Sequence, residues 1–337
     1  MVSIKDVAEK ADVSISTVSR VLNGHPNVSD EKKKQVSKAV DELDYIPNAL
    51  ARGLVTRSTY SVGILISDIA NDFYSILVRS MEDVLNKEGY FTVIGNTDWN
   101  KEKEKNYLNY FLQKQVDGFI LASTILQEEE IKKIASDLPV VLLDRNIKGE
   151  GIDRIRIDDV RGGYLAAEHL IDMGYKQLVH ITGPDGIASS EDRKKGFTQA
   201  VENRNFPLNK VDFIPGHYVE QAGYEAAEDF FTPPNNFTSI GIFSANDAMA
   251  FGVLKYLNEH KFSCPHRVGL VGFDDISLAG YTNPPLTSIS RPITKIGQQA
   301  GKLLLQRMTG NSKEKKGGAV EFDVALVKRQ STIKQNH

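Results

Sequence analysis

The sequence predicts an N-terminal all-α helix-turn-helix headpiece followed by an α/β core of two doubly wound parallel-sheet lobes. Two observations lead to this prediction. Two short helical patterns joined by a tight corner occupy the first 23 residues, and from Tyr60 onward short apolar runs alternate with helical patterns. A chain of 337 residues is long enough for a small module plus a large core. We therefore expect a headpiece at 1–46, a hinge helix and linker at 47–59, and a core at 60–330.

The first two helices have clear start signals and apolar faces. Ser3 is expected to cap the first helix, because Asp6 stands three positions later as in a capping box. Its apolar stripe consists of Ile4, Val7, Ala8 and Ala11. Ser14 is expected to cap the second helix, whose inward face is made of Val18, Val21 and Leu22. The residues that point away from this small core are Ile15, Ser16, Ser19 and Arg20.

This outward face suits the major groove of DNA. An arginine can bind guanine O6 and N7, and methyl-bearing groups can contact thymine. A solvated polar face on an ordinary three-helix cap is the alternative that the residues alone leave open. A third helix is expected over Asp30 to Asp44, after Ser29. The stretch 47–54 that follows makes only about two helical turns, so we expect it to order only on a partner.

The core pattern consists of two successive sets of strands and helices. The first strands are expected at Ser61 to Ser67, Phe91 to Gly95, Gly118 to Ala122 and Val140 to Leu143, with helices from Phe73 to Gly89 and near Glu102 to Gln113 and Glu128 to Asp137. The second strands are expected at Leu178 to Thr182, Val211 to Ile214, Ile240 to Phe243 and Val268 to Gly272. Their helices lie near Gly163 to Met173, Glu191 to Asn205, Glu220 to Phe231 and Asp247 to Glu259. Nearly continuous apolar strands separated by helices are typical of parallel sheets that are covered on both faces.

Composition limits the cellular context and the class of function. The net charge is −3, and the first 60 residues hold nine Lys or Arg against eight Asp or Glu, so any DNA binding depends on where charges lie. The single cysteine, Cys264, excludes an intrachain disulfide and fits a reducing compartment. Neither a signal-peptide pattern nor a run of 18 apolar residues occurs, so we expect a cytoplasmic protein without a membrane partner.

The motif search does not favour an enzyme. The sequence contains no G-x-S-x-G elbow, no H-E-x-x-H, no phosphate loop and no dinucleotide fingerprint, and its seven histidines have no ligand spacing. We therefore expect no catalytic residue, cofactor or metal site. Acid pairs at strand ends could indicate a glycosidase, but a binding cleft explains them equally well.

Polar side chains follow several of the expected strands. Ligands of doubly wound sheets bind at the carboxyl ends of the strands, so a cleft between two lobes is the expected site. Carboxylates and an arginine can share the paired hydroxyls of a sugar, and an aromatic face can cover its C–H surface. The polar runs at these strand ends are Asn71-Asp72-Phe73-Tyr74, Asp144-Arg145-Asn146, Asp158-Asp159, Ser244-Ala245-Asn246-Asp247 and Phe273-Asp274-Asp275, and Arg193 follows a later strand.

Three runs of the chain resemble the LacI/GalR family of bacterial repressors. They are Ile4-Lys5-Asp6-Val7-Ala8, Ser16-Thr17-Val18-Ser19-Arg20-Val21-Leu22-Asn23 and Tyr45-Ile46-Pro47-Asn48-Ala49-Leu50-Ala51-Arg52-Gly53-Leu54. The resemblance implies a repressor that binds double-stranded operator DNA as a homodimer, with hinge helices of two subunits paired in the minor groove and Leu54 wedged between base pairs. The DNA contacts that it implies are Ser3, Lys5, Ser14, Ile15, Ser16, Thr17, Ser19, Arg20, Asn23, Ala51 and Leu54.

The same resemblance implies a core like that of periplasmic sugar-binding proteins, with a small-molecule sugar effector between its lobes. The first lobe would take Tyr60 to about Asp158 and the helix near Thr294 to Thr309. The second would take about Asp159 to Leu286 and a last strand near Val320 to Val327. The effector contacts carried over by motif are Phe73, Asp144, Arg145, Arg193, Tyr218, Asn246 and Asp274.

Two branches of the family remain open. Leu142-Leu143-Asp144-Arg145 and Glu191-Asp192-Arg193 are similar to the ribose operon repressors and suit a free sugar. Gln115-Val116-Asp117-Gly118 also resembles the catabolite control branch, in which a phosphorylated phosphocarrier protein acts as corepressor. The sugar is the main reading, and the protein corepressor is the alternative.

Overall fold

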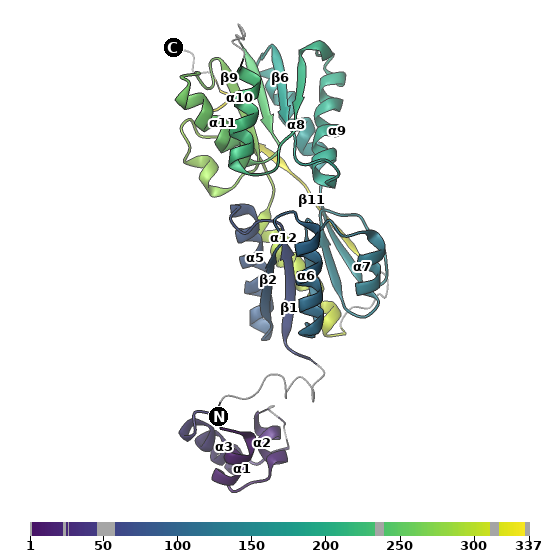
Figure 1. Cartoon of the computed structure of the whole chain (residues 1–337), viewed down its shortest axis with the longest axis vertical. Coiled ribbons are helices and arrows are strands. Elements are labelled where there is room, and N and C mark those ends of the chain that lie inside the picture. Colours follow the sequence, from purple (N-terminus) through teal and green to yellow (C-terminus); the bar gives the residue numbers. More distant parts are fainter. Residues whose placement is uncertain are drawn as a thin grey trace. The chain divides into compact units, whose positions relative to one another are not determined.

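The chain divides into two compact units, and the boundary in the sequence falls between Tyr60 and Ser61. The computed structural model describes residues 2–22, 25, 27–45, 58–232, 239–310 and 317–333 (Figure 1). Most of the expected hinge at 47–59 therefore lies outside the described residues.

The N-terminal unit is a bundle of three short helices. They are α1 (Ile4–Lys10), α2 (Ile15–Leu22) and α3 (Asp30–Glu42). The capping box is confirmed, because the backbone N–H of Ser3 donates to Asp6 Oδ2 at 2.7 Å. The Ser14 hydroxyl accepts from the N–H of Thr17 at 3.1 Å, as expected for a cap. The third helix ends at Glu42, two residues before the expected end. The fully buried centre of the bundle is made of Val7, Val18 and Val36.

The larger unit contains two six-stranded sheets, one in each lobe. The first sheet has the order β11-β5-β4-β3-β1-β2 and is parallel throughout. Its strands are β1 (Ser61–Ile66), β2 (Phe91–Asn96), β3 (Gly118–Ala122), β4 (Val140–Leu143), β5 (Ile152–Ile157) and β11 (Ala319–Phe322). The second has the order β12-β10-β9-β8-β6-β7, with β12 antiparallel to β10. Its strands are β6 (Gln177–Ile181), β7 (Val211–Ile214), β8 (Ile240–Ser244), β9 (Val268–Asp274), β10 (Thr287–Ser290) and β12 (Ala325–Val327).

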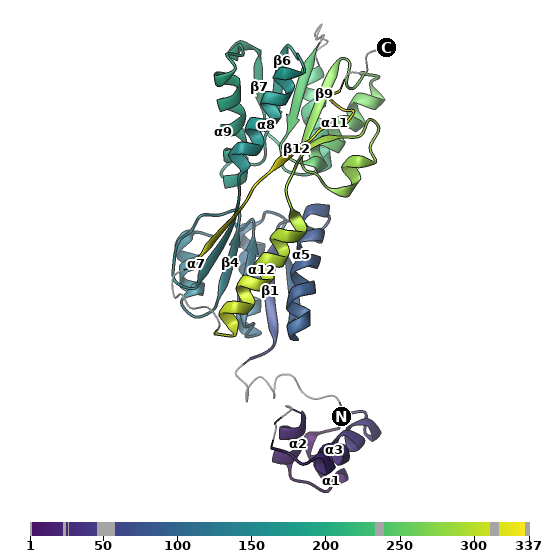
Figure 2. The ribbon, with the colours of Figure 1, turned by 180° about the vertical axis from the view of Figure 1, so that it is seen from behind.

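Helices cover both faces of each sheet, as the alternating pattern predicts. The helices of the first lobe are α5 (Asp72–Leu85), α6 (Lys101–Gln113), α7 (Glu128–Ala135) and α12 (Ile293–Met308). Those of the second lobe are α8 (Asp159–Asp172), α9 (Ala188–Asn203), α10 (Glu220–Phe231) and α11 (Asp247–Glu259). Short 3-10 turns complete the described helices: η1 (Asn86–Glu88), η2 (Leu208–Lys210) and η3 (Ser277–Gly280). In the first lobe, α5 packs beside α12 on one face of the sheet (Figure 2), and α6 lies on the other face (Figure 1).

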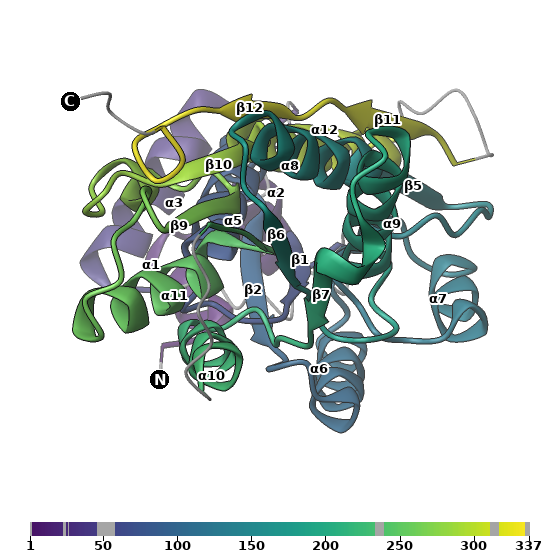
Figure 3. The same ribbon diagram turned by 90° about the horizontal axis from the view of Figure 1, so that it is seen from above.

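The chain crosses between the lobes three times, after β5, after β10 and after β11. The expected assignment of the last strand to the second lobe was wrong. It is two strands, since β11 pairs with β5 in the first sheet and β12 pairs with β10 in the second (Figure 3). The sequence reads as one alternating run because only two residues, Asp323 and Val324, separate them. The pattern also missed β5 and β10, and β10 extends the second lobe beyond the expected boundary at Leu286.

A buried histidine lies in the core of the second lobe. The His180 ring is fully buried and stacks on Phe197 and Phe243, with ring centroids at 5.1 and 4.5 Å. Nδ1 lies 3.1 Å from the carbonyl oxygen of Phe243. Burial lowers the pKa of His180 to about 3, so the ring stays neutral in the folded protein.

This histidine should make the second lobe sensitive to acid. In the unfolded chain, a histidine has a pKa of about 6.5. The buried, neutral ring of His180 therefore gives its full contribution to stability above that pH, and this contribution is lost as the pH falls toward about 3. We expect His180→Phe to reduce the slope of unfolding free energy against pH by about 1.4 kcal/mol per pH unit between pH 4.5 and 5.5. Urea unfolding at several pH values measures this slope. His266→Gln, which changes an exposed histidine, is the control, and an unchanged slope in His180→Phe would contradict the prediction.

Candidate functional site

The strand ends of the two lobes enclose a narrow cavity. Six of the seven residues that the sequence analysis proposed for an effector line it: Phe73, Asp144, Arg193, Tyr218, Asn246 and Asp274. The other lining residues are Asn71, Tyr74, Trp99, Ser123, Ser189 and Arg291. Asn71 and Tyr74 belong to a strand-end run noted in the sequence, whereas the other four were not predicted. The free volume is only about 20 Å³, room for about one water molecule. Side chains therefore fill this cavity, which we call the inner cavity.

Arg193 on α9 is buried, with 2% of its surface exposed. Its Nε donates to Asp159 Oδ1 at 2.7 Å, and its Nη1 donates to the carbonyl oxygen of Ala245. The guanidinium carbon lies 3.6 Å from the centre of the Phe273 ring. These contacts give Arg193 a structural role in joining α8, α9 and the end of β8, in addition to its place in the cavity wall.

Arg291 is the arginine that the sequence analysis missed. It directly follows β10, and its guanidinium lies flat over Phe73 of the first lobe, 3.6 Å from the ring centre. Its Nη2 is 2.6 Å from Oδ1 of Asp274 at the end of β9. Its Nε and Nη1 are buried and have no hydrogen-bond partner among the described residues. The strand before it, β10, has only four residues and little apolar character, so the sequence pattern did not reveal that Arg291 follows a strand.

The carboxylates of the inner cavity differ in how well they are paired. Oδ1 of Asp144 is buried without a hydrogen-bond partner in the described parts of the chain, and Oδ2 accepts only a long bond of 3.4 Å from Ser123. Burial raises the pKa of Asp144 and of Asp274, although Arg291 opposes the rise in both. The Asn246 side chain is used twice, because its oxygen accepts from Met249 N–H and its amide donates to Tyr218 carbonyl, both at 2.9 Å.

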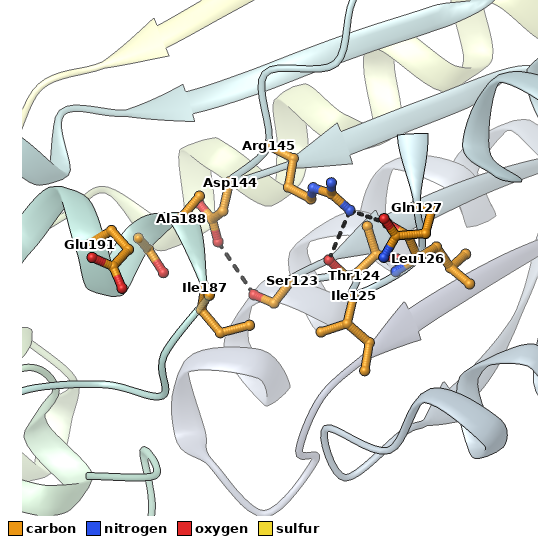
Figure 4. A pocket seen from close by; sticks show the side chains of 12 residues that line it. Ser123, Thr124, Ile125, Leu126, Gln127, Asp144, Arg145, Ile187, Ala188 and Glu191 are labelled. Atoms are coloured by element: carbon orange, nitrogen blue, oxygen red, sulfur yellow. Dashed lines mark hydrogen bonds between the residues drawn. The ribbon is translucent and has the colours of Figure 1, made fainter. Parts of the chain in front are cut away.

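Arg145, the seventh proposed residue, lines a wider cavity next to the inner one. This outer cavity has a volume of about 360 Å³ and shares Ser123, Asp144 and Ser189 with the inner cavity. Nη1 of Arg145 donates to the carbonyl oxygens of Thr124 and Leu126, so Arg145 holds the loop that follows β3 (Figure 4). The outer cavity lies between this loop, residues 123–127, and residues 186–189 together with Glu191.

Aromatic side chains from both lobes complete the inner cavity. Phe73 is buried at the start of α5, and Asn71 caps that helix by accepting from Phe73 N–H at 3.0 Å. Tyr218 lies on the second lobe, and its hydroxyl is 3.4 Å from that of Ser189. Trp99 of the first lobe contacts Tyr218, with ring centroids 5.6 Å apart. The sequence analysis missed Trp99 because its partner belongs to the other lobe.

The headpiece exposes the face proposed to read DNA. Ile15, Ser16 and Arg20 of α2 are exposed, and Ser19 is half-buried. Ser3, Lys5 and Ser14 are exposed and Thr17 is half-buried; the Ser14 hydroxyl is 2.8 Å from those of Ser16 and Thr17. Asn23, Ala51 and Leu54 lie outside the described residues. A surface helix that exposes an isoleucine and an arginine beside hydroxyl groups can contact base edges.

Among the described residues, no group of three or more His, Cys, Asp or Glu side chains is placed to hold a metal ion. The described helices include none that is both long enough and apolar enough to span a bilayer.

Known proteins match this chain over nearly its whole length. The model for bacterial regulatory proteins of the lacI family matches residues 3–48, and the periplasmic binding protein-like domain matches 167–332. Catabolite control protein A of Priestia megaterium is 35% identical over 98% of this chain and 99% of its own length. The ribose operon repressor of Halalkalibacterium halodurans is 36% identical over 98% of this chain and 97% of its own.

Solved structures agree with these relatives. A LacI family transcriptional regulator from Enterococcus faecium with bound ribose has a TM-score of 0.73 at 32% identity, and the match covers 82% of this chain and all of that one. The Lac repressor dimer bound to operator and the anti-inducer ONPF has a TM-score of 0.83 at 26% identity, and the match covers 99% of both chains.

The contacts of Arg193 predict a large loss of stability on truncation. Arg193→Ala would leave Asp159 buried without its cation, so we expect the free energy of unfolding to fall by about 3–5 kcal/mol. Arg204→Ala removes an exposed arginine paired with Asp172 and should cost less than about 1 kcal/mol. Urea unfolding of both variants tests this, and equal small losses would show that the buried pair is not important for folding.

Proposed function

The chain belongs to the LacI family of bacterial regulatory proteins, and we propose that a small sugar, with ribose as the first candidate, sets its affinity for operator DNA. It is a sequence-specific DNA-binding transcriptional regulator with a sugar-binding type of core. One of its relatives is named as the ribose operon repressor, and transcriptional repressors are not enzymes. Because its proposed partner is operator DNA, we place its action in the cytoplasm.

The unpartnered polar atoms of the inner cavity carry the sugar proposal. Asp144 Oδ1 can accept, Arg291 Nε and Nη1 can donate, and none has a hydrogen-bond partner in the described ranges. A buried polar group without a partner costs about 1–3 kcal/mol, so a ligand that supplied both donors and acceptors would be favoured. A hydroxyl group both donates and accepts. A polyol therefore fits this set better than a ligand that offers only acceptors.

The charges of the inner cavity support an uncharged ligand. Its two guanidinium groups are already matched, since Arg193 pairs with Asp159 and Arg291 pairs with Asp274. Asp144 is a further carboxyl, and no ion pair with an arginine is formed by it within the described parts of the chain. A phosphate or carboxylate would have to displace one of these pairs and lie near Asp144. Among candidate effectors, we therefore rank free sugars above sugar phosphates, in line with the two ribose-associated relatives.

On the DNA side, we propose that two copies bind one near-palindromic operator. One recognition helix reads only a few base pairs, so a second copy is needed for a long site. The Lac repressor in the matched structure is a dimer on operator. Large apolar groups on the core of this chain are available for self-association, because Leu278 in η3 and Tyr281 directly after η3 are 47% and 85% exposed. Leu54 and Ala51 are proposed minor-groove contacts by family resemblance.

The alternative function is control by a phosphorylated phosphocarrier protein. The observation that favours it is the similarity to catabolite control protein A over nearly the full chain. In that case no free sugar would shift operator affinity, whereas a phosphorylated carrier protein would strengthen it. The two proposals therefore differ in a single binding measurement.

A thermal-shift screen of pentoses, hexoses, disaccharides and their phosphates tests the sugar proposal. A ligand present at 100 times its dissociation constant adds about 2.7 kcal/mol to the stability of the folded state. We expect D-ribose or a closely related free sugar to raise the melting temperature, and sugar phosphates to have little effect. A screen in which no sugar raises it would favour the protein corepressor.

Asp144→Asn is the matched binding variant for that screen. Asp144 has a φ of 63°, a conformation that asparagine tolerates well, so the substitution should keep the fold. It removes a hydrogen-bond acceptor of the inner cavity, and we expect sugar affinity measured by calorimetry to fall at least about tenfold. Operator affinity without sugar should stay unchanged. If the variant binds sugar as the parent does, Asp144 is not in the site.

Arg20→Ala tests base recognition. On a site selected from random DNA, we expect it to cost about 1–3 kcal/mol of binding energy and to relax base preference at one position of each half-site. Electrophoretic mobility shift with the selected site and with its single-base variants measures both effects. An equal loss on unrelated DNA would show instead that Arg20 contacts phosphate.

A further inference from the structure

The one tryptophan of the chain, Trp99, is held in an unusual loop at the edge of the first lobe. It lies between β2 and α6, and both Asp98 and Trp99 have left-handed backbone angles, with φ of 50° and 56°. Non-glycine residues adopt this region rarely, and two in succession need support from their surroundings. The loop must therefore be fixed by specific contacts.

Backbone and side-chain hydrogen bonds supply that support. The N–H of Thr97 donates to the carbonyl of Ile66 at 2.9 Å, and the N–H of Asp98 donates to that of Ser67 at 2.7 Å. The Asp98 carboxylate accepts from Asn96 Nδ2 at 2.5 Å and from Lys103 at the start of α6. The loop is thus tied to the end of β1 and to α6, both in the first lobe.

The indole of Trp99, by contrast, packs on the second lobe. Its centroid is 5.6 Å from that of Tyr218, with 36° between the ring planes, and it packs against the second-lobe apolar cluster that contains Tyr218 and Met249. The other ring pairs recorded for the described residues lie within one lobe, for example Tyr224 with Tyr256. Tyr218 is held in place in turn, because Asn246 donates to its carbonyl oxygen at 2.9 Å.

The size of the inner cavity gives this contact a role. The free volume of about 20 Å³ is far below the 300 Å³ or more that is usual for a ligand site. A sugar therefore needs more room than the inner cavity has, and separation of the two lobes would supply it. Trp99 and Tyr218 lie on opposite lobes and both line the cavity, so this separation must break or shift their contact.

We propose that the Trp99–Tyr218 contact is a latch across the cleft that must open for sugar to enter and to leave. This inference rests on the proposed sugar function. A latch lowers the fraction of molecules that can bind, and it also slows escape from the closed complex. Weakening it should therefore raise the association and the dissociation rate constants together, with little change in affinity.

The test is the kinetics of radiolabelled D-ribose by rapid filtration on the full chain. Offset aromatic contacts are weak, and their loss corresponds to roughly two- to twelvefold in an equilibrium. We expect Trp99→Ala to raise both rate constants by roughly that factor while the dissociation constant changes less than about threefold. Trp99→Phe keeps a ring and should stay closer to the parent. Tyr224→Ala removes a ring contact inside the second lobe and is the matched control, with rates like those of the parent.

Two kinetic outcomes would overturn the proposal. If Trp99→Ala weakens ribose binding through faster dissociation alone, Trp99 contacts the sugar directly and is not a latch. If both rate constants stay at the parent values, the contact does not control the cleft. Thermal unfolding of each variant separates these effects from a general loss of stability.

A measurement without sugar tests the latch if calorimetry detects no ribose binding. Trp99 is the only tryptophan, so its fluorescence reports on this contact alone. We expect the parent to be shielded from iodide quenching and Tyr218→Ala to be quenched at least about twofold more strongly. Equal and full quenching of both proteins would overturn the latch, whereas the absence of ribose binding would count against the proposed effector only.

Discussion

The cleft depends on the contact that Arg291 makes with both lobes at once. Its guanidinium lies over the ring of Phe73 in the first lobe and against the carboxylate of Asp274 in the second. A buried arginine is costly to desolvate, and here one carboxylate and the rings of Phe73 and Phe273 offset that cost only in part. Two of its nitrogens have no hydrogen-bond partner among the described residues. These two nitrogens lie where the lobes meet, so they can still donate hydrogen bonds to a ligand.

Much of the fold follows from the alternation of apolar runs, and the errors occur where that signal is short or divided. The eight strands expected from Ser61 to Gly272 are all present, because most of them are short and nearly continuous apolar runs. β5 carries Asp153, Arg154 and Arg156 and does not read as a buried strand. β11 and β12 read as one strand because the chain changes lobes over only two residues, and hydrophobic period alone cannot reveal such a crossing.

The sequence predicted the site residues that lie at the ends of single strands. It did not predict those whose position depends on contacts between the two lobes. Asp144, Arg193 and Asn246 follow strands or family motifs and reach the same cavity. Arg145 follows the same strand as Asp144, but its side chain turns to the carbonyl oxygens of the loop after β3. Strand-end position determines which edge of the sheet a residue occupies, whereas the direction of a long side chain depends on nearby acceptors. Trp99 and Arg291 needed knowledge of packing between lobes.

The placement of the two buried ion pairs suggests how the lobes can respond to a ligand. Asp159 lies two residues beyond the end of β5, and Arg291 follows β10 directly, so each lies at a crossing between the lobes. The partner of each, Arg193 or Asp274, belongs to the second lobe. A ligand in the inner cavity can bond to Arg193, Asp274 and Arg291, which line it. It therefore acts directly on the crossing after β10, and through Arg193 on Asp159 at the crossing after β5. It can favour one arrangement of the lobes only by its difference in affinity for the two arrangements, and any such coupling to DNA binding is reciprocal.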